Sequence, residues 1–187
     1  MDNVVLLEFI RECNSELIAD KPVLYEAYFL KIYVAFERFL GDLFEEYCLG
    51  NSSSKGYVPR RKLDFDCLEQ LRNVLNSGKK LNYIDYIDKI KNLSKNIFDD
   101  NPFDILLEDA ENVTYFNQMT LLRNCIAHES EFSKKKYKEG CLANGDFIPP
   151  GEFLIAKKSG QTQSNYTLFV NKIIEISEGL ITPAEEA

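Results

Sequence analysis

The stretch from Pro22 to Gly50 can form one long helix, and this feature limits the folds open to the chain most strongly. Proline is tolerated in the first turn of a helix, and apolar residues then recur at helical spacing over about 28 residues. The apolar side is broad and rich in aromatic rings, so we expect this helix at the centre of the fold. That side includes Leu24, Ala27, Tyr28, Ile32, Ala35, Phe36, Phe39, Leu40, Leu43 and Phe44.

Four further segments show the apolar spacing of helices. They cover residues 3–18, 63–78, 81–98 and 105–129, and the last should carry a kink or a cap near Asp109–Asn112. At 187 residues the chain is long enough for one well-buried domain. The predicted fold class is all-α, an antiparallel helical bundle in a single domain covering residues 1–187.

The pattern changes after residue 139. Glycines, a Pro-Pro pair and two short β-prone runs, FLIA and YTLFV, follow one another around a polar turn. This order predicts a small β-hairpin as an appendage within residues 140–170. A short helix over 171–180 should close the chain, and 182–187 should form a flexible tail.

The chain lacks the signals that direct a protein to a membrane or out of the cell. No apolar run reaches the roughly 18 residues that a membrane span requires. The N-terminus begins acidic and has no basic region followed by a small-residue cleavage site. We therefore expect a cytoplasmic protein that does not associate with a membrane.

Cysteine and histidine usage argues against a metal site. The cysteines are an odd set without CxxC or CxxH spacing, which indicates reduced thiols. One histidine cannot supply a multi-histidine site, so metal catalysis would have to rest on carboxylates alone. We expect no metal and no cofactor. The cysteines are Cys13, Cys48, Cys67, Cys125 and Cys141.

The net charge of −8 argues against a protein that coats nucleic acid generally. It leaves room for a locally basic cleft, because basic residues cluster in RRK at 60–62 and in KKKYK at 134–138. The simpler interpretation of both clusters is a solvated loop or helix face.

The single histidine, His128, ends the stretch LLRNCIAH, and Arg123 precedes it by five positions. On a helical wheel of residues 113–128, the face that carries His128 holds no lysine or glutamate, which suggests contact with a partner subunit or ligand. Asn124 and His128 lie one turn apart and can touch. Alternatively, His128 is only a favourable charge at a helix C-terminus. The core arc comprises Met119, Leu121, Leu122, Cys125 and Ile126, and the contact face comprises Thr120, Arg123, Asn124, Ala127 and His128.

The stretch RNCIAHE resembles the Arg-x4-6-His signature of the HEPN superfamily, with Arg123, Asn124 and His128 at the motif positions. The long helix with EAYFLKIYVAFERFLGDLF is similar to the first major HEPN helix, particularly in the RiboL-PSP-type subgroup. The resemblance covers roughly residues 20–130 in architecture, and its sequence support comes mainly from these two helices.

The resemblance implies a homodimer with facing motif helices and a metal-independent endoribonuclease that acts as a toxin or an antiviral effector. Attack by a 2′-hydroxyl on its own phosphate needs proton transfer, which suits His128 as acid and base. Arg123 offers a charged planar fork for the phosphate. Asn124 would orient His128 or contact a phosphate oxygen. A two-fold dimer would place two copies of each residue in one cleft.

Other residues are weaker candidates. Glu37 could orient Arg123 or be an ordinary solvated or helix-pairing glutamate. Tyr137 could stack on a base. Ser130 occupies the position of a tyrosine that is nucleotidylated in some HEPN toxins, so that regulation is not expected here. The RNA backbone could be guided by Lys134, Lys135, Lys136 and Lys138.

Two other functions stay open. The chain could be a non-catalytic HEPN module that binds RNA, a nucleotide or a protein partner such as an antitoxin or regulator. It could also be a purely structural dimeric bundle in which His128 caps a helix. An RNA cleavage assay in EDTA would separate these alternatives.

Overall fold

The computed structural model describes residues 2–17, 21–78, 84–157 and 160–183. Every regular element in these ranges is a helix, and none of the described residues forms a β-strand, so the all-α class is confirmed. No helix in the described ranges has the length and apolar character needed to span a bilayer. The helices are α1 (Val4–Glu16), α2 (Pro22–Cys48), α3 (Leu68–Leu75), α4 (Tyr86–Ile97), α5 (Asp104–Leu107), α6 (Ala110–His128), α7 (Glu131–Cys141), α8 (Pro150–Ile155) and α9 (Asn165–Ile181).

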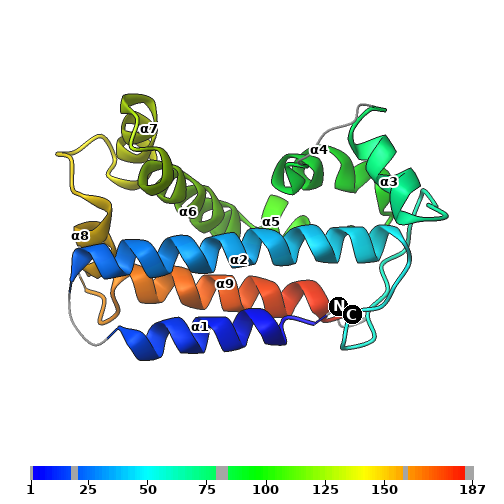
Figure 1. Cartoon of the computed structure of the whole chain (residues 1–187), viewed down its shortest axis with the longest axis horizontal. Helices are drawn as coiled ribbons and strands as arrows, with labels where there is room; N and C mark the ends of the chain where they lie inside the picture. The colour runs from blue at the N-terminus through cyan, green and yellow to red at the C-terminus, as the bar shows by residue number, and fades with distance from the viewer. Residues whose placement is uncertain (1, 18–20, 79–83, 158–159, 184–187) are drawn as a thin grey trace.

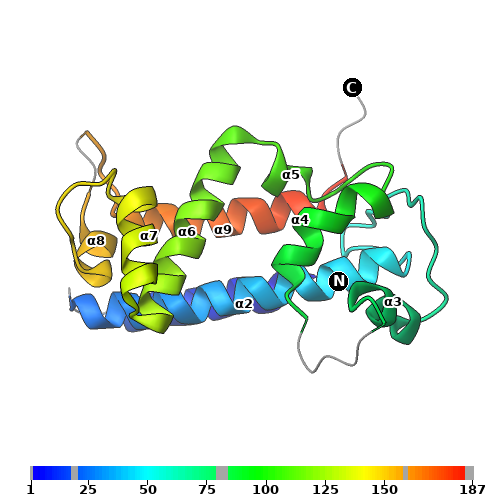
Figure 2. The ribbon, with the colours of Figure 1, turned by 90° about the horizontal axis from the view of Figure 1, so that it is seen from above.

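Helix α2 is the long central helix that the sequence predicts. It begins at Pro22, continues for 27 residues and contacts α1, α4, α6, α8 and α9. Figure 1 shows α1 and α9 lying along α2, and Figure 2 shows α4 and α6 above it at separate points. The fully buried side chains of α2 include Phe29, Ile32, Tyr33, Phe36, Leu40, Leu43 and Phe44.

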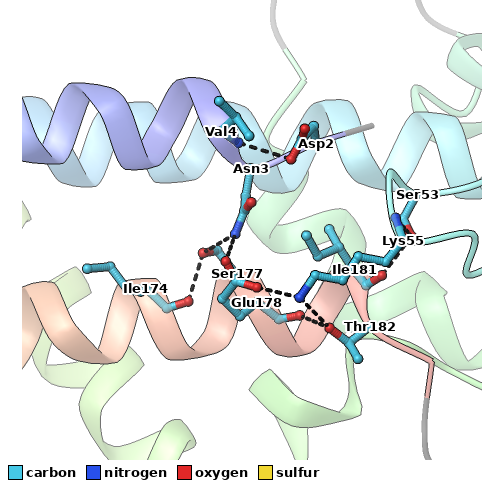
Figure 3. A network of polar contacts seen from close by, with 10 residues as sticks. All are labelled: Asp2, Asn3, Val4, Ser53, Lys55, Ile174, Ser177, Glu178, Ile181 and Thr182. Atoms are coloured by element: carbon cyan, nitrogen blue, oxygen red, sulfur yellow. Dashed lines mark hydrogen bonds and ion pairs between the residues drawn. The ribbon is translucent and has the colours of Figure 1, made fainter.

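A polar network joins the start of α1 to the last turns of α9 (Figure 3). Asn3 Nδ2 donates to Ser177 Oγ at 3.2 Å and to Glu178 Oε1 at 2.8 Å. Lys55 Nζ lies 2.6 Å from Glu178 Oε2, and Ser53 Oγ donates to a main-chain carbonyl near the end of α9 at 2.6 Å. The hydrogen bonds from Lys55 and Asn3 lower the pKa of Glu178. The network fixes α1 against α9 beside α2.

The predicted β-hairpin is wrong. Its first run, FLIA, lies largely in α8, which Pro150 opens as a first-turn proline. Its second run, YTLFV, forms the start of α9, which therefore begins well before residue 171. The side chain of Ser164 caps this helix by accepting from the Thr167 N–H. In the described part of 140–170, the only pairing of β type is an isolated bridge between Lys157 and Ser164.

The apolar spacing explains why a helix forms instead. Buried residues recur along α9 at three or four positions, as one helix face requires. Phe169 packs against Phe29 of α2, and Tyr25 meets Tyr166 edge-on at a ring distance of 5.2 Å. These contacts need a helix, so tertiary packing overrides the local β-preference. The buried apolar face comprises Tyr166, Phe169, Val170, Ile173, Ile176, Leu180 and Ile181.

Other predicted boundaries are close to those observed. The Asp109 side chain accepts from the Asn112 N–H at 2.8 Å, so the expected cap separates α5 from α6. Helix α3 begins later than residue 63, and α7 is an additional helix over the lysine cluster. The predicted helix start at 81–83 and the tail residues 184–187 lie outside the described residues.

Candidate functional site

Helix α6 carries the motif and presents its predicted core face to the bundle. Met119, Leu122 and Cys125 are buried, and α6 packs against α2, α7 and α9. Leu121 and Ile126 are half-buried, and Leu121 faces α7 at Gly140. The opposite face holds the polar residues Thr120, Arg123 and Asn124, and the contact with a partner subunit or ligand that the wheel suggests for this face stays a prediction.

Arg123 is held at the crossing of α6 and α2. Its Nη2 lies 3.1 Å from Glu37 Oε2, and its Nη1 donates to Asn124 Oδ1 at 3.0 Å. The Nε atom is buried and has no hydrogen-bond partner in the described part of the chain. Both charged side chains are about a quarter exposed, at 24% and 26%. The structure therefore brings Arg123, Asn124 and Glu37 together.

The environment of Glu37 opposes its negative charge. Burial raises the pKa of Glu37, and the nearby Arg123 guanidinium only partly counteracts this effect. The negative charge of Asp85, the N-cap residue of α4, raises that pKa further. The ion pair thus lies in a partly desolvated region where α2 and α6 meet near the start of α4.

A second polar link joins α2 and α6, one helical turn from the Arg123–Glu37 pair on each helix. The Tyr33 hydroxyl is 2.6 Å from Thr120 Oγ1, and Thr120 Oγ1 donates to the Phe116 carbonyl at 2.8 Å. Because that hydroxyl hydrogen is used, Tyr33 acts as the donor to Thr120. Tyr33 is fully buried, and burial raises its pKa. Together with the Arg123–Glu37 pair, this link sets the position of α6 on α2.

Tyr33 is a site-supporting residue that the sequence did not identify. It lies on the apolar stripe of α2, where an aromatic residue is ordinarily core. The available signal was Thr120, which the wheel places on the polar face with Arg123 and Asn124. A buried tyrosine hydroxyl usually finds a partner, but its partner lies 87 positions away in the sequence.

His128 is the last residue of α6 and is exposed. Glu129 follows in the left-handed conformation with φ of 49°, which ends the helix and turns the chain into α7. No hydrogen bond or ion pair to His128 occurs among the described residues. The predicted contact between His128 and Asn124 is therefore not formed there. Asn124 Oδ1 accepts from Arg123 instead. The imidazole is therefore accessible to solvent or to a partner.

The lysines of α7 are mostly paired within their own helix. Lys134 lies 3.3 Å from Glu131, while Lys136 and Lys135 lie 3.0 and 4.0 Å from Glu139. Lys138 is half-buried. This arrangement is that of an ordinary solvated helix face, and exposed pairs of this kind contribute little to stability.

The predicted stacking role of Tyr137 is wrong. Its ring is fully buried and meets Phe147 and Phe153 edge-on, at ring distances of 6.1 and 5.8 Å. Its hydroxyl donates to the Ile148 carbonyl at 3.1 Å. A base could not reach either face of this ring. Ser130, two residues after His128, caps α7 by accepting from the Ser133 N–H.

The basic cluster at 60–62 also has structural partners. Arg61 Nη1 donates to the Cys48 carbonyl at 2.9 Å, and Arg61 pairs with Asp64 at 3.0 Å. Lys62 Nζ donates to the Lys95 carbonyl at 2.7 Å. These bonds connect the loop after α2 to neighbouring helices.

Across the described ranges, no group of three or more histidine, cysteine, aspartate or glutamate side chains could hold a metal ion. The groups that the site itself offers are an accessible imidazole, a fixed guanidinium, an amide and a carboxylate. No family model, curated protein or solved structure matches the chain.

Proposed function

We propose that this protein is a metal-independent endoribonuclease of the HEPN type that acts as a homodimer in the cytoplasm. The observation that supports the proposal is the position of Arg123 and His128 on one helix. Arg123 is anchored by Glu37 and Asn124, while His128 ends the same helix with its imidazole exposed. Phosphodiester cleavage by a neighbouring 2′-hydroxyl needs a cation for the phosphate and an accessible acid–base group, and this helix carries one of each.

In the proposed reaction, a base removes the proton from the 2′-hydroxyl as its oxygen attacks the phosphorus. The bond to the 5′-oxygen breaks, and an acid returns a proton to that leaving oxygen. His128 serves as the acid–base group because an imidazole can both accept and donate a proton. The products are a 2′,3′-cyclic phosphate and a 5′-hydroxyl.

Arg123 would stabilise the charge that accumulates on the phosphate. A guanidinium has five N–H donors, two on each terminal nitrogen and one on Nε. Glu37 and Asn124 each engage one terminal nitrogen, so one N–H of Nη1 and one of Nη2 remain for phosphate oxygens. Glu37 and Asn124 would act as positioning residues, because they hold the guanidinium in place.

A dimer would complete the site. Each chain has a single histidine, whereas the reaction needs both an acid and a base. Ala127 and His128 are both exposed at the end of α6, and the small Ala127 side chain permits close approach of a second α6. A two-fold axis there would bring two His128 and two Arg123 side chains into one cleft.

An alternative is a non-catalytic module that binds RNA, a nucleotide or a protein partner at the same face. The observation that favours it is the Arg123–Glu37 pair, which already neutralises much of the cation. As a nuclease, the protein would act as a toxin or an antiviral effector, restrained by an antitoxin or regulatory protein. As a binding module, it would leave RNA intact.

The proposal is tested by incubating purified protein with RNA in EDTA. We expect cleavage by the parent and a loss of about 10²-fold or more in rate for His128→Ala. Arg123→Ala should lose activity as well. Thr114→Ala is the matched control, because Thr114 is exposed on α6 and, within the described residues, its hydroxyl bonds only to the Ala110 carbonyl. Equal cleavage by the parent and His128→Ala would show that the nuclease assignment of His128 is wrong.

A further inference from the structure

A long groove lies between α1 and α2, away from the motif. It has a volume of about 920 Å³. Figure 1 shows α1 and α6 on opposite sides of α2, so this groove and the motif face are separate surfaces. The apolar side chains along it are Val5, Leu6 and Phe9 from α1 and Leu30, Val34 and Phe39 from α2.

The groove is built from whole helix faces. On α1 its apolar positions are 5, 6 and 9, and on α2 they recur every three or four residues between Leu30 and Phe39. From Leu30 to Asp42 the wall extends roughly 18 Å at about 1.5 Å per residue. Val5 is 78% exposed and Val34 39% exposed, so apolar surface faces solvent on both walls. A third helix of about 12 residues would match this length.

The charges along the groove are asymmetric. Lys31 and Arg38 lie two turns apart on the α2 wall, both are exposed, and neither has an ion pair among the described residues. Asp2 and Asp42 lie beyond Arg38, and Asp42 follows Arg38 by one helical turn. Helix α1 runs antiparallel to α2, since Tyr28 near the start of α2 donates to Glu16 at the end of α1. This course places Asp2, before α1, at the same end of the groove as Asp42.

We infer that this groove binds an amphipathic helix of a partner protein. The helix would place apolar residues at positions i, i+4 and i+7 in the groove and two carboxylates, two turns apart, against Lys31 and Arg38. Its N-terminus would point toward Asp2 and Asp42, because the N-terminal end of a helix carries partial positive charge. The inference does not depend on ribonuclease activity.

The experiment is selection from a displayed library of single amphipathic helices against the full chain, followed by fluorescence anisotropy of the selected peptides. Val5→Glu and Val34→Glu place a charge on either wall of the groove, and Lys31→Glu with Arg38→Glu reverses the rim. Lys135→Glu, an exposed lysine on α7, is the control. Thermal unfolding of each variant verifies its fold, and the high exposure of Val5 makes Val5→Glu tolerable.

We expect the selected peptides to carry paired acidic residues. Their Kd should rise at least about 10-fold with Val5→Glu, with Val34→Glu and with the rim reversal, and should not change with Lys135→Glu. Replacing the peptide carboxylates by lysine should restore affinity for the rim-reversed protein. Peptides without acidic residues, or peptides whose binding ignores Val5→Glu, would overturn the inference. So would self-association of the chain that Val5→Glu abolishes, because the groove would then bind a second copy.

Discussion

The Arg123 guanidinium and the Glu37 carboxylate lie 3.1 Å apart and join α6 to α2, although 86 positions separate them in the sequence. Both side chains are mostly covered by the protein, so the pair lies between a surface ion pair and a buried one. Replacing Arg123 should therefore have two effects that can be measured separately, one on the free energy of unfolding and one on the rate of RNA cleavage.

Arg123→Ala should lower the free energy of unfolding by about 1–2 kcal/mol, between the values typical of exposed and buried pairs. The loss arises because Glu37 would keep its charge in a partly desolvated place without a cation. Urea denaturation followed by circular dichroism measures it. In a Glu37→Gln background the same substitution should cost less, because no carboxylate is left unpaired. An equal cost in both backgrounds would mean that the pair contributes nothing.

The stability of the protein should depend on pH through Glu37. Burial raises the pKa of Glu37 above its ordinary value of 4.5, so the folded state holds this proton more tightly than the unfolded chain. The contribution of Glu37 is therefore full below the unfolded pKa and is lost as the pH rises through the folded pKa. Asp85 and Arg123 act on the same group, and the balance still raises its pKa.

Subtracting the Glu37→Gln variant isolates this effect from other titrating groups. The difference in unfolding free energy, parent minus variant, should decrease as the pH is raised from about 4 to about 7. Urea denaturation at constant ionic strength measures it. A difference that increases over this range would indicate that Arg123 outweighs burial and that the pKa of Glu37 is lowered.

The hydrogen bond between Tyr33 and Thr120 predicts an order of effects. Tyr33→Phe removes one hydrogen bond and should cost about 0.5–1.5 kcal/mol. Thr120→Val should cost more, about 1–3 kcal/mol, because it leaves the fully buried Tyr33 hydroxyl without its acceptor. The double variant should be close to Tyr33→Phe alone. A double-mutant cycle by urea denaturation measures this coupling, and simple additivity would contradict the bond.

Subunit mixing tests whether one chain is half of a site. The proposed reaction uses two His128 side chains, one as the acid and one as the base, so a dimer of one parent chain and one His128→Ala chain would lack one of them. After subunit exchange with an excess of His128→Ala, the parent should therefore lose activity, because most parent chains then lie in mixed dimers. The same two preparations assayed before exchange are the control, and their activity should equal that of the parent alone. A mixture of confirmed, exchanged dimers that keeps the full activity of the parent would contradict a shared site.

Local spacing was sufficient for the long central helix and for the two faces of α6. Helical periodicity is a property of neighbouring residues, so the burial of Met119, Leu122 and Cys125 could be predicted without knowing the fold. The cap at Asp109 was predictable for the same reason, because the bond to the Asn112 N–H lies within four residues.

Tertiary structure decided the rest. The run YTLFV has β-preference by itself, but Tyr166 and Phe169 find their partners on α2, and that packing requires a helix. Tyr137 is in a lysine-rich run, yet its ring is enclosed by Phe153 from a later helix. The sequence alone determined which residues share a helix face. Which faces meet, and so whether Glu37 reaches Arg123, depends on contacts between distant segments that no local pattern encodes.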